Sequence, residues 1–215
     1  ACSRYPMPMP RLPIDRRRFL ILGLALGLPA AAAAQTAVDD FVIAVANDRV
    51  DTVRAMLAKG VDPNVVGKDG HPALVTAARE GSANALDALL AAGAKVDARS
   101  GYGDTALMLA ALNGRLEIAK KLRAKGAALD YPGWTPLIYA ATGGHDEVVK
   151  YLLGEGAKIN STSPNGTSAL MMATREGKFA TAELLIARGA DVNHRNADGA
   201  SALTWAERND DKILV

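Results

Sequence analysis

The side chains best suited to acid–base, nucleophilic or metal chemistry are few in this sequence and far apart. Its 215 residues include three histidines, at positions 71, 145 and 194, and one cysteine, Cys2. A catalytic triad needs a nucleophile, a histidine and a carboxylate that the fold brings together, and a zinc site needs closely spaced Cys or His ligands. The sequence shows neither pattern, because His71 and His194 fall in distant loops and His145 follows a glycine pair, where we expect it to help start a helix. We therefore predict no enzyme activity, no metal site and no cofactor.

Acidic residues and glycines recur in the loops of the sequence, which favours a structural role for them. Aspartate side chains in loops commonly hydrogen-bond the backbone of turns, and this is how we interpret Asp62, Asp97, Asp130 and Asp191. The glycine-rich loops lack the Lys-Ser or Lys-Thr pair and the preceding strand of a phosphate-binding loop. These residues predict turns and no phosphate site.

Two series of glycines set the spacing of the elements that must carry these loops. One series opens each unit, with separations of 33, 30, 33 and 33 residues, at Gly70, Gly103, Gly133, Gly166 and Gly199. The other closes the second helix of each unit, with separations of 33, 33, 30 and 33 residues, at Gly60, Gly93, Gly126, Gly156 and Gly189. Two independent series with one period predict an internal structural repeat.

The stretch from Gly133 to Asn160 shows what one repeat encodes. Thr135 is a favourable N-cap residue, and Pro136 suits the first helical position because that position has no partner for its N–H. An apolar face follows, and the glycine pair that ends at Gly144 closes this helix. A second apolar face then recurs at helical spacing, and Gly156 can adopt the left-handed conformation that ends a helix. The unit is predicted to be helix–turn–helix followed by a loop.

In these features the chain resembles the ankyrin repeat, which has a period of 33 and the signature Thr-Pro-Leu-His-x-Ala. The resemblance covers residues 37–215. Its five signature copies are Pro72-Ala73-Leu74, Thr105-Ala106-Leu107, Thr135-Pro136-Leu137, Ser168-Ala169-Leu170 and Ser201-Ala202-Leu203. The resemblance implies an all-α ankyrin-repeat solenoid of stacked helix–turn–helix units with β-hairpin-like loops. We call these loops fingers.

The pattern divides the chain into a leader and signal peptide, residues 1–34, and an ankyrin repeat domain, residues 35–215. The domain is predicted to contain an N-terminal cap repeat over 37–66, full repeats over 67–99, 100–129, 130–162 and 163–195, and a partial C-terminal repeat over 196–215. In the cap repeat, Phe41 to Ala46 occupy the place of the first inner helix, and Asp48 replaces the turn glycine.

Three departures from the family pattern carry expectations of their own. The signature His is absent, so other contacts must hold the fingers; its places are taken by Val75, Met108, Ile138, Met171 and Thr204. The link between Gly126 and Gly133 is three residues shorter than its counterparts, which predicts a notch in the row of fingers. The sequence stops at Val215, where a second helix should be starting. We expect either a fragment or an end that another chain covers, with Leu203 and Trp205 poorly covered.

The first 34 residues are interpreted as targeting sequence. Residues 1–14 are proline-rich and begin at Ala1, and we read them as an upstream extension or a disordered leader. Arg16, Arg17, Phe19 and Leu20 resemble the twin-arginine export motif, and the apolar run that follows is short for a membrane span. We expect cleavage near Ala34 and a periplasmic protein. The alternatives are a general secretory signal and a retained anchor in the inner membrane, with the repeats facing the periplasm.

Removal of the leader changes the charge balance. Five of the 25 basic residues and one of the 23 acidic residues lie in residues 1–34, which leaves 20 basic and 22 acidic residues and a net charge of −2. Nucleic-acid binding needs a concentrated basic face, and this chain gives no reason to expect one. The only cysteine is lost as well, which agrees with an oxidising compartment.

A binding surface is the remaining functional expectation. The resemblance implies a concave face lined by finger tips and by the exposed turns of the inner helices. By repeat position it is formed by Lys68, Asp69, His71, Arg79, Glu80, Tyr102, Asp104, Leu112, Asn113, Tyr131, Trp134, Thr142, Asn165, Arg175 and Glu176. Tyr102, Tyr131 and Trp134 come from adjacent repeats beside the shortened finger. Exposed aromatic residues are favoured interface anchors. Packing between fingers is the competing interpretation; we weigh the two equally for Trp134 and favour packing for the tyrosines.

These observations predict an exported scaffold that binds another protein on its concave face. The chain is similar to exported bacterial ankyrin proteins that support periplasmic enzymes, such as catalases, in oxidative stress. An inhibitor or immunity-type protein that occludes a target enzyme is one alternative. A small-molecule enzyme is the alternative from another class. We expect no nucleic-acid partner, and membrane contact only during export or through a retained anchor.

Overall fold

The computed structural model of the protein describes residues 30–208, and Arg16, Arg17, Phe19 and Leu20 of the predicted export motif lie outside them. Within this range all regular structure is helical apart from two isolated β-bridges at finger bases. The helices are α1 (Ala30–Ala46), α2 (Val50–Ala58), α3 (Ala73–Glu80), α4 (Ala83–Ala91), α5 (Ala106–Leu112), α6 (Leu116–Ala124), α7 (Pro136–Gly143), α8 (Asp146–Gly154), α9 (Ala169–Arg175), α10 (Phe179–Ala187) and α11 (Ala202–Arg208). The predicted all-α class is confirmed.

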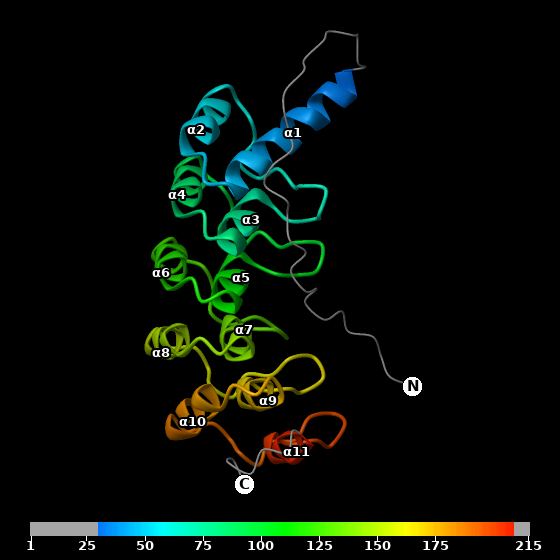
Figure 1. The fold of residues 1–215 in the computed structure, drawn as a ribbon, viewed down its shortest axis with the longest axis vertical. Helices are drawn as coiled ribbons and strands as arrows, with labels where there is room; N and C mark the ends of the chain where they lie inside the picture. The colour runs from blue at the N-terminus through cyan, green and yellow to red at the C-terminus, as the bar shows by residue number, and fades with distance from the viewer. Residues whose placement is uncertain (1–29, 209–215) are drawn as a thin grey trace.

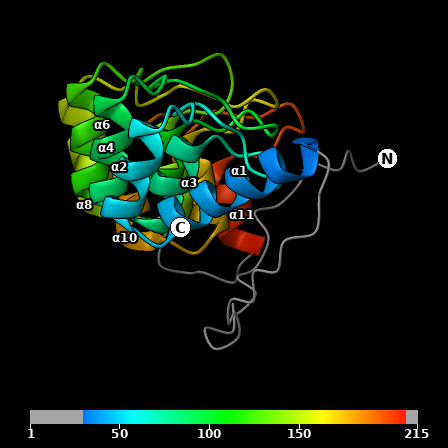
Figure 2. The same ribbon diagram turned by 90° about the horizontal axis from the view of Figure 1, so that it is seen from above.

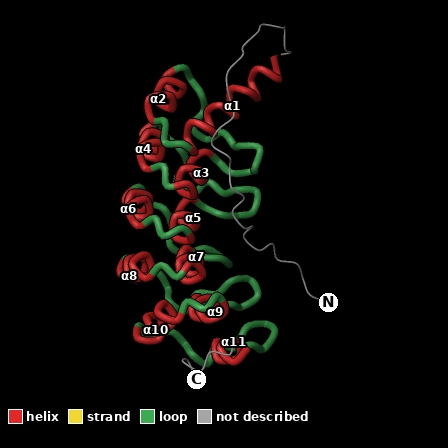
Figure 3. The backbone as a smooth tube through the Cα atoms, viewed as in Figure 1, coloured by secondary structure: helices red, strands yellow, loops and turns green. Residues whose placement is uncertain are grey.

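The helices form two layers that run the length of the molecule. Odd-numbered helices stack as the inner layer and even-numbered helices from α2 to α10 stack as the outer layer (Figure 1). The fingers project from the inner layer and follow one another as a row (Figure 3). Viewed from above, the loops gather along one edge of the helical stack (Figure 2). This arrangement is the predicted solenoid of helix–turn–helix repeats.

The third full repeat folds as its sequence predicts. The Thr135 side chain accepts a hydrogen bond from the Ile138 amide at 3.3 Å, and Pro136 is the first residue of α7. Gly144 ends the helix with φ of 74°, and Gly156 follows α8 with φ of 95°. Each of these signals acts on a helix end within a few residues of its own position, so the sequence alone was enough to predict the helix boundaries.

Small and branched apolar residues fill the space between repeats. Leu74, Leu107, Leu137 and Leu170 stand at the same place in successive inner helices and are each at most 2% exposed. The fifth residue of this series, Leu203 on α11, is 45% exposed. The inner helices are rich in buried alanine, which lets neighbouring layers approach closely. The core is therefore continuous from α1 to α9 and incomplete over α11 within the described residues.

The first repeat departs from the others in the way expected of a cap. Asp48 takes the place of the turn glycine with φ of 53°, and its carboxylate accepts hydrogen bonds from the Ala85 amide at 2.7 Å and from Asn84 at 2.8 Å. Helix α1 begins at Ala30 and so runs through the cleavage point predicted near Ala34. No helix in residues 30–208 has the length and apolar character needed to cross a bilayer.

Side chains at the turns between inner and outer helices join consecutive repeats. In several repeats, the residue just before the outer helix hydrogen-bonds through its side chain to the last carbonyl of the inner helix in the preceding repeat. Ser82 donates to the carbonyl of Ala46 at 3.0 Å, and Arg115 donates to the carbonyl of Glu80 at 3.3 Å. His145 belongs to the same series, although the sequence had suggested that it helps start α8; its ring makes no cap hydrogen bond there.

Candidate partner-binding surface

Four of the five fingers are closed by the same pair of backbone hydrogen bonds. In each of them, the backbone N–H of the residue three positions before the opening glycine donates to the carbonyl of the residue four positions further along the chain. The N–H of the opening glycine then donates to the carbonyl of the first of these residues. The first bond measures 2.9–3.0 Å and joins Gly67 to His71, Ser100 to Asp104, Ser163 to Thr167 and Asn196 to Ala200. These four fingers are short, self-closed hairpins.

The third finger, residues 127–134, is built differently. Asp130 holds the position of Ser100 and Ser163, yet no backbone hydrogen bond closes this finger among the residues that the structure describes. The Asp130 carboxylate instead accepts from the Ser161 hydroxyl of the fourth finger at 3.4 Å. Figure 1 shows a smaller loop before α7 than before α5 or α9. The sequence-based expectation of a notch rests on this missing length, and the bonding pattern agrees with it.

Trp134 lies at the end of the third finger and is half-buried. Its ring meets Tyr139 of α7 edge-on, with centroids 5.9 Å apart and an interplanar angle of 76°. The Tyr139 hydroxyl donates to the carboxylate of Asp104 in the second finger. Burial and this hydrogen bond raise the pKa of Tyr139 above its usual range. Trp134 is therefore packed against a fixed support and still has part of its surface open to solvent.

Tyr131 braces the second finger. Its hydroxyl donates to Asp97 at 2.6 Å, and the Arg99 guanidinium lies 4.4 Å from the ring centroid. Burial, with the Asp97 hydrogen bond, raises the pKa of Tyr131 above its usual range. These contacts agree with the interpretation of Tyr131 as packing between fingers.

Tyr102 and His71 form a separate pair one finger away. Tyr102 is 70% exposed, and its ring lies 5.7 Å from that of His71. No ring contact joins Tyr102 to Tyr131 or Trp134 within residues 30–208. His71 was predicted on the binding face, but it is only 8% exposed because Tyr102 and the finger cover it. Its pKa is lowered by burial and by the charge of Arg79.

The predicted charged residues of the face make local ion pairs. Lys68 pairs with Asp39 of α1, and Arg79 bridges Asp69 at 3.1 Å and Glu80 at 2.9 Å. In the fourth full repeat Arg175 lies 3.6 Å from Glu176, and its guanidinium is 5.8 Å from the Trp205 ring centroid. The signs of charge are mixed along the face, so no single charge dominates it.

The predicted polar residues mainly serve their own elements. Asn113 and Thr142 return hydrogen bonds of 2.8 Å to the carbonyls of Leu109 and Ile138 one turn back. The Asn165 side chain accepts from the Thr167 amide at 3.3 Å, and the Leu112 side chain is half-buried. These polar side chains therefore mainly stabilise their own helices and fingers.

Sequence reasoning missed the support beneath this surface. Tyr139, Asp97 and Arg99 were not predicted as part of it. One signal was available for Tyr139, because it stands where the neighbouring inner helices carry Leu109 and Met172, both nearly buried. An aromatic hydroxyl at that position extends beyond the aliphatic side chains and can reach Asp104 in the finger of the preceding repeat.

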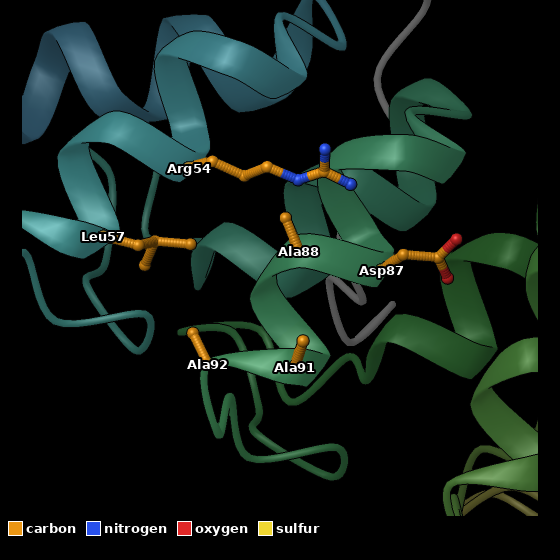
Figure 4. Close-up of a pocket in the computed structure, with 6 residues that line it drawn as sticks. All are labelled: Arg54, Leu57, Asp87, Ala88, Ala91 and Ala92. Carbon is orange, nitrogen blue, oxygen red and sulfur yellow. The ribbon is translucent and has the colours of Figure 1, made fainter.

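A hollow on the opposite side of the molecule has a different character. It lies on the outer layer between α2 and α4 and has a volume of about 460 Å³ (Figure 4). Its lining is formed by Arg54, Leu57, Asp87, Ala88, Ala91 and Ala92. Asp87 also pairs with Lys121 of α6 at 2.6 Å. Residues 30–208 contain no group of three or more His, Cys, Asp or Glu side chains placed to hold a metal ion.

Comparison with known proteins identifies the family. A family model described as ankyrin repeats in three copies matches residues 41–132, 96–163 and 137–214. The chain belongs to the ankyrin repeat family. Arrays of this family typically bind other proteins and are typically not enzymes, which gives this chain a role in protein–protein interaction.

The curated relatives are similar over a much smaller part. M-phase phosphoprotein 8 from human, mouse and rat is 38% identical over 52 residues, which are 24% of this chain and 6% of the relative. The chain therefore corresponds to a small part of these relatives' length. They show what one stretch of the repeats resembles.

Proposed function

We propose that this chain is an exported scaffold that binds a partner protein through the surface around Trp134, in support of a periplasmic stress-related enzyme. The observation that carries the proposal is Trp134 itself: a large, partly exposed aromatic side chain that is held against Tyr139, beside the one finger of the described residues that is not self-closed. A rigidly supported aromatic residue loses little conformational entropy when a partner covers it, so it is suited to be an interface anchor.

The charged residues of the first finger and of α3, which lie elsewhere on the predicted face, support selectivity more than affinity. Asp69, Arg79, Glu80 and Lys68 already have partners of opposite sign within the chain. Exposed pairs of this kind contribute little net free energy, but they penalise a partner whose charges do not match. We assign most of the binding free energy to the aromatic surface.

The export part of the proposal is supported by the sequence of the leader alone. Arg16 and Arg17 precede Phe19 and Leu20, and an apolar run follows them. A repeat array suits either export route, since each repeat contacts only its neighbours and needs no cofactor to fold.

The test is capture of a partner from periplasmic extract, followed by affinity measurement with two variants. Trp134→Ala should weaken binding by about 1–3 kcal/mol while the thermal unfolding transition remains cooperative. Lys150→Ala is the matched control on the outer helix α8, where Lys150 pairs with Glu147 at 2.7 Å. It should leave affinity unchanged.

If Lys150→Ala weakens binding and Trp134→Ala does not, the partner sits on the outer layer and the proposed surface is wrong. An assay of the captured partner separates the scaffold from the inhibitor. A scaffold leaves the partner's activity intact or raises it, whereas an inhibitor abolishes it.

A further inference from the structure

Neighbouring fingers are joined to each other by backbone hydrogen bonds at two places in the row. The Gly101 amide of the second finger donates to the Gly70 carbonyl of the first at 2.9 Å. The Ala197 amide of the fifth finger donates to the Asn165 carbonyl of the fourth at 2.9 Å. The first and second fingers therefore form one linked pair, and the fourth and fifth form another.

The third finger belongs to neither pair. Tyr131 holds the position of Gly101, two residues before the opening glycine, and its amide makes no such bond within the described residues. Pro164 holds the same position in the fourth finger and has no N–H to donate. Its ring instead packs against Gly133, where an added Cβ would lie 3.2 Å from it.

The third finger is thus left with open backbone groups. Four backbone groups close each of the other fingers. Their counterparts in the third finger are the N–H groups of Asp130 and Gly133 and the carbonyls of Asp130 and Trp134. None of these four has a hydrogen-bond partner among residues 30–208, and all three residues are partly exposed to solvent. Unpaired backbone donors and acceptors at partly exposed residues are available to the backbone of another chain.

We propose that the partner inserts an extended peptide segment into the notch, pairs its backbone with the third finger at Asp130 to Trp134, and places an apolar side chain on Trp134. This inference rests on the proposed function and names the class of partner: a protein with an accessible extended segment. A partner helix would not serve, since its own backbone groups are already paired within the helix.

The local charges add a preference within that segment. Asp97 accepts from Tyr131, Asp104 accepts from Tyr139 beneath Trp134, and Asp130 belongs to the finger itself. Arg99, over the Tyr131 ring, is the cation in contact with this group. Carboxylates outnumber cations here, so a basic residue beside the apolar one is favoured over an acidic one.

The first arm of the test fills the notch from within the chain. A chimera replaces residues 127–132 with a copy of residues 94–102, which restores the three missing residues and the self-closing serine position. The matched control replaces residues 190–198 of the fifth finger, which has the full length already, with the same nine-residue copy. Circular dichroism and thermal unfolding check that both proteins fold.

The chimera should bind the captured partner at least roughly tenfold more weakly than the unaltered protein, and the control should bind it equally well. If the unaltered protein captures no partner, the proposed function fails and this inference falls with it. If the chimera binds as tightly as the unaltered protein, the proposed function stands and the notch inference alone is wrong.

The second arm decides the matter even if the chimera does not fold. Overlapping synthetic 12-residue peptides that span the captured partner are tested for binding, and the binding peptide is then N-methylated one residue at a time. Methylation at alternate residues should weaken binding roughly tenfold, because alternate N–H groups of an extended strand face one side. A partner that binds through no linear peptide, or a peptide insensitive to methylation, overturns the inference.

Discussion

The Nε2 atom of His145 lies 2.9 Å from the carbonyl oxygen of Leu112, which is the last residue of α5, the inner helix of the preceding repeat. The same ring covers two glycines: an added Cβ on Gly114 or on Gly143 would lie 2.5 Å from an atom of the imidazole. His145 therefore joins consecutive repeats through a hydrogen bond and fills space that only glycine leaves open.

This relationship predicts coupling between Gly114 and His145. Gly114→Ala should destabilise the protein by about 1–2 kcal/mol because its φ is 66°, a left-handed conformation that costs side chains this much, and by a further amount from the clash. His145→Ala should cost about 1 kcal/mol through the lost hydrogen bond. The double variant should lose less than the sum, since removing the ring removes the clash. Urea unfolding measures all three, and strict additivity would show that the ring moves aside freely.

The burial of His71 predicts a loss of stability in acid. Its folded pKa lies below the ordinary value of 6.5, mainly because burial disfavours the charged ring. The unfolded chain therefore binds the proton first, and the contribution of His71 to stability is present above about pH 6.5 and is lost as pH falls through the folded pKa. Arg79 lowers the pKa further, whereas Asp69 and Asp104 act against it.

The measurement is the free energy of unfolding at about pH 7.5 and about pH 5, on either side of the ordinary histidine pKa. His71→Gln should show a smaller drop between the two conditions than the unaltered protein. Because all other titrating groups are shared, the difference between the two drops isolates His71. An equal drop in both proteins would mean that the ring is protonated in the folded state without cost.

The exposure of Leu203 predicts that α11 is the least stable inner helix of the described residues. Its counterparts in α3, α5, α7 and α9 are at most 2% exposed, whereas Leu203 is 45% exposed. Less buried apolar surface means a lower free energy of local opening. Hydrogen exchange should show residues 202–208 opening before residues 106–175. Equal protection of both ranges in a monomer would mean that other contacts cover α11.

The leader predicts the route of export. Replacing both Arg16 and Arg17 by Lys should hold the precursor in the cytoplasm if the twin-arginine route is used. Arg18→Lys is the matched control, since position 18 lies within the same basic run but outside the pair. Fractionation and immunoblotting of the precursor and mature forms give the result. Unimpaired export of the double variant would favour the general secretory route, and uncleaved protein in the membrane fraction would favour a retained anchor.

The fold could be predicted from the sequence because its signals are local. Thr135 and Pro136 start a helix, Gly144 ends it, and the period carries the same instructions to every repeat. The surface was harder to predict, because its contacts join residues about one repeat apart. Tyr131 and Asp97 are separated by 34 positions, and the pairing depends on how far each side chain reaches between fingers.

The burial of His71 was missed for a related reason. The repeat register places it at a finger base, where Asp104 and Trp134 are partly exposed in the neighbouring repeats. Whether the ring turns in or out depends on Tyr102 of the next finger, which lies against it. A periodic pattern identifies equivalent positions but does not assign equivalent environments to them.

The grouping of the fingers has a mechanical consequence. Backbone bonds tie the first two fingers together and the last two together. The third finger is held to its neighbours through side chains instead, because Asp97 accepts from the Ala128 amide and the Tyr131 hydroxyl, and Asp130 accepts from the Ser161 hydroxyl. The helical side has no such interruption, because Leu107, Leu137 and Leu170 are all buried along it. Links through side chains yield more easily than links between backbone groups, so we expect a bending motion of the solenoid to concentrate at the third finger. Such bending would change the curvature of the concave face at the place where we propose that the partner binds.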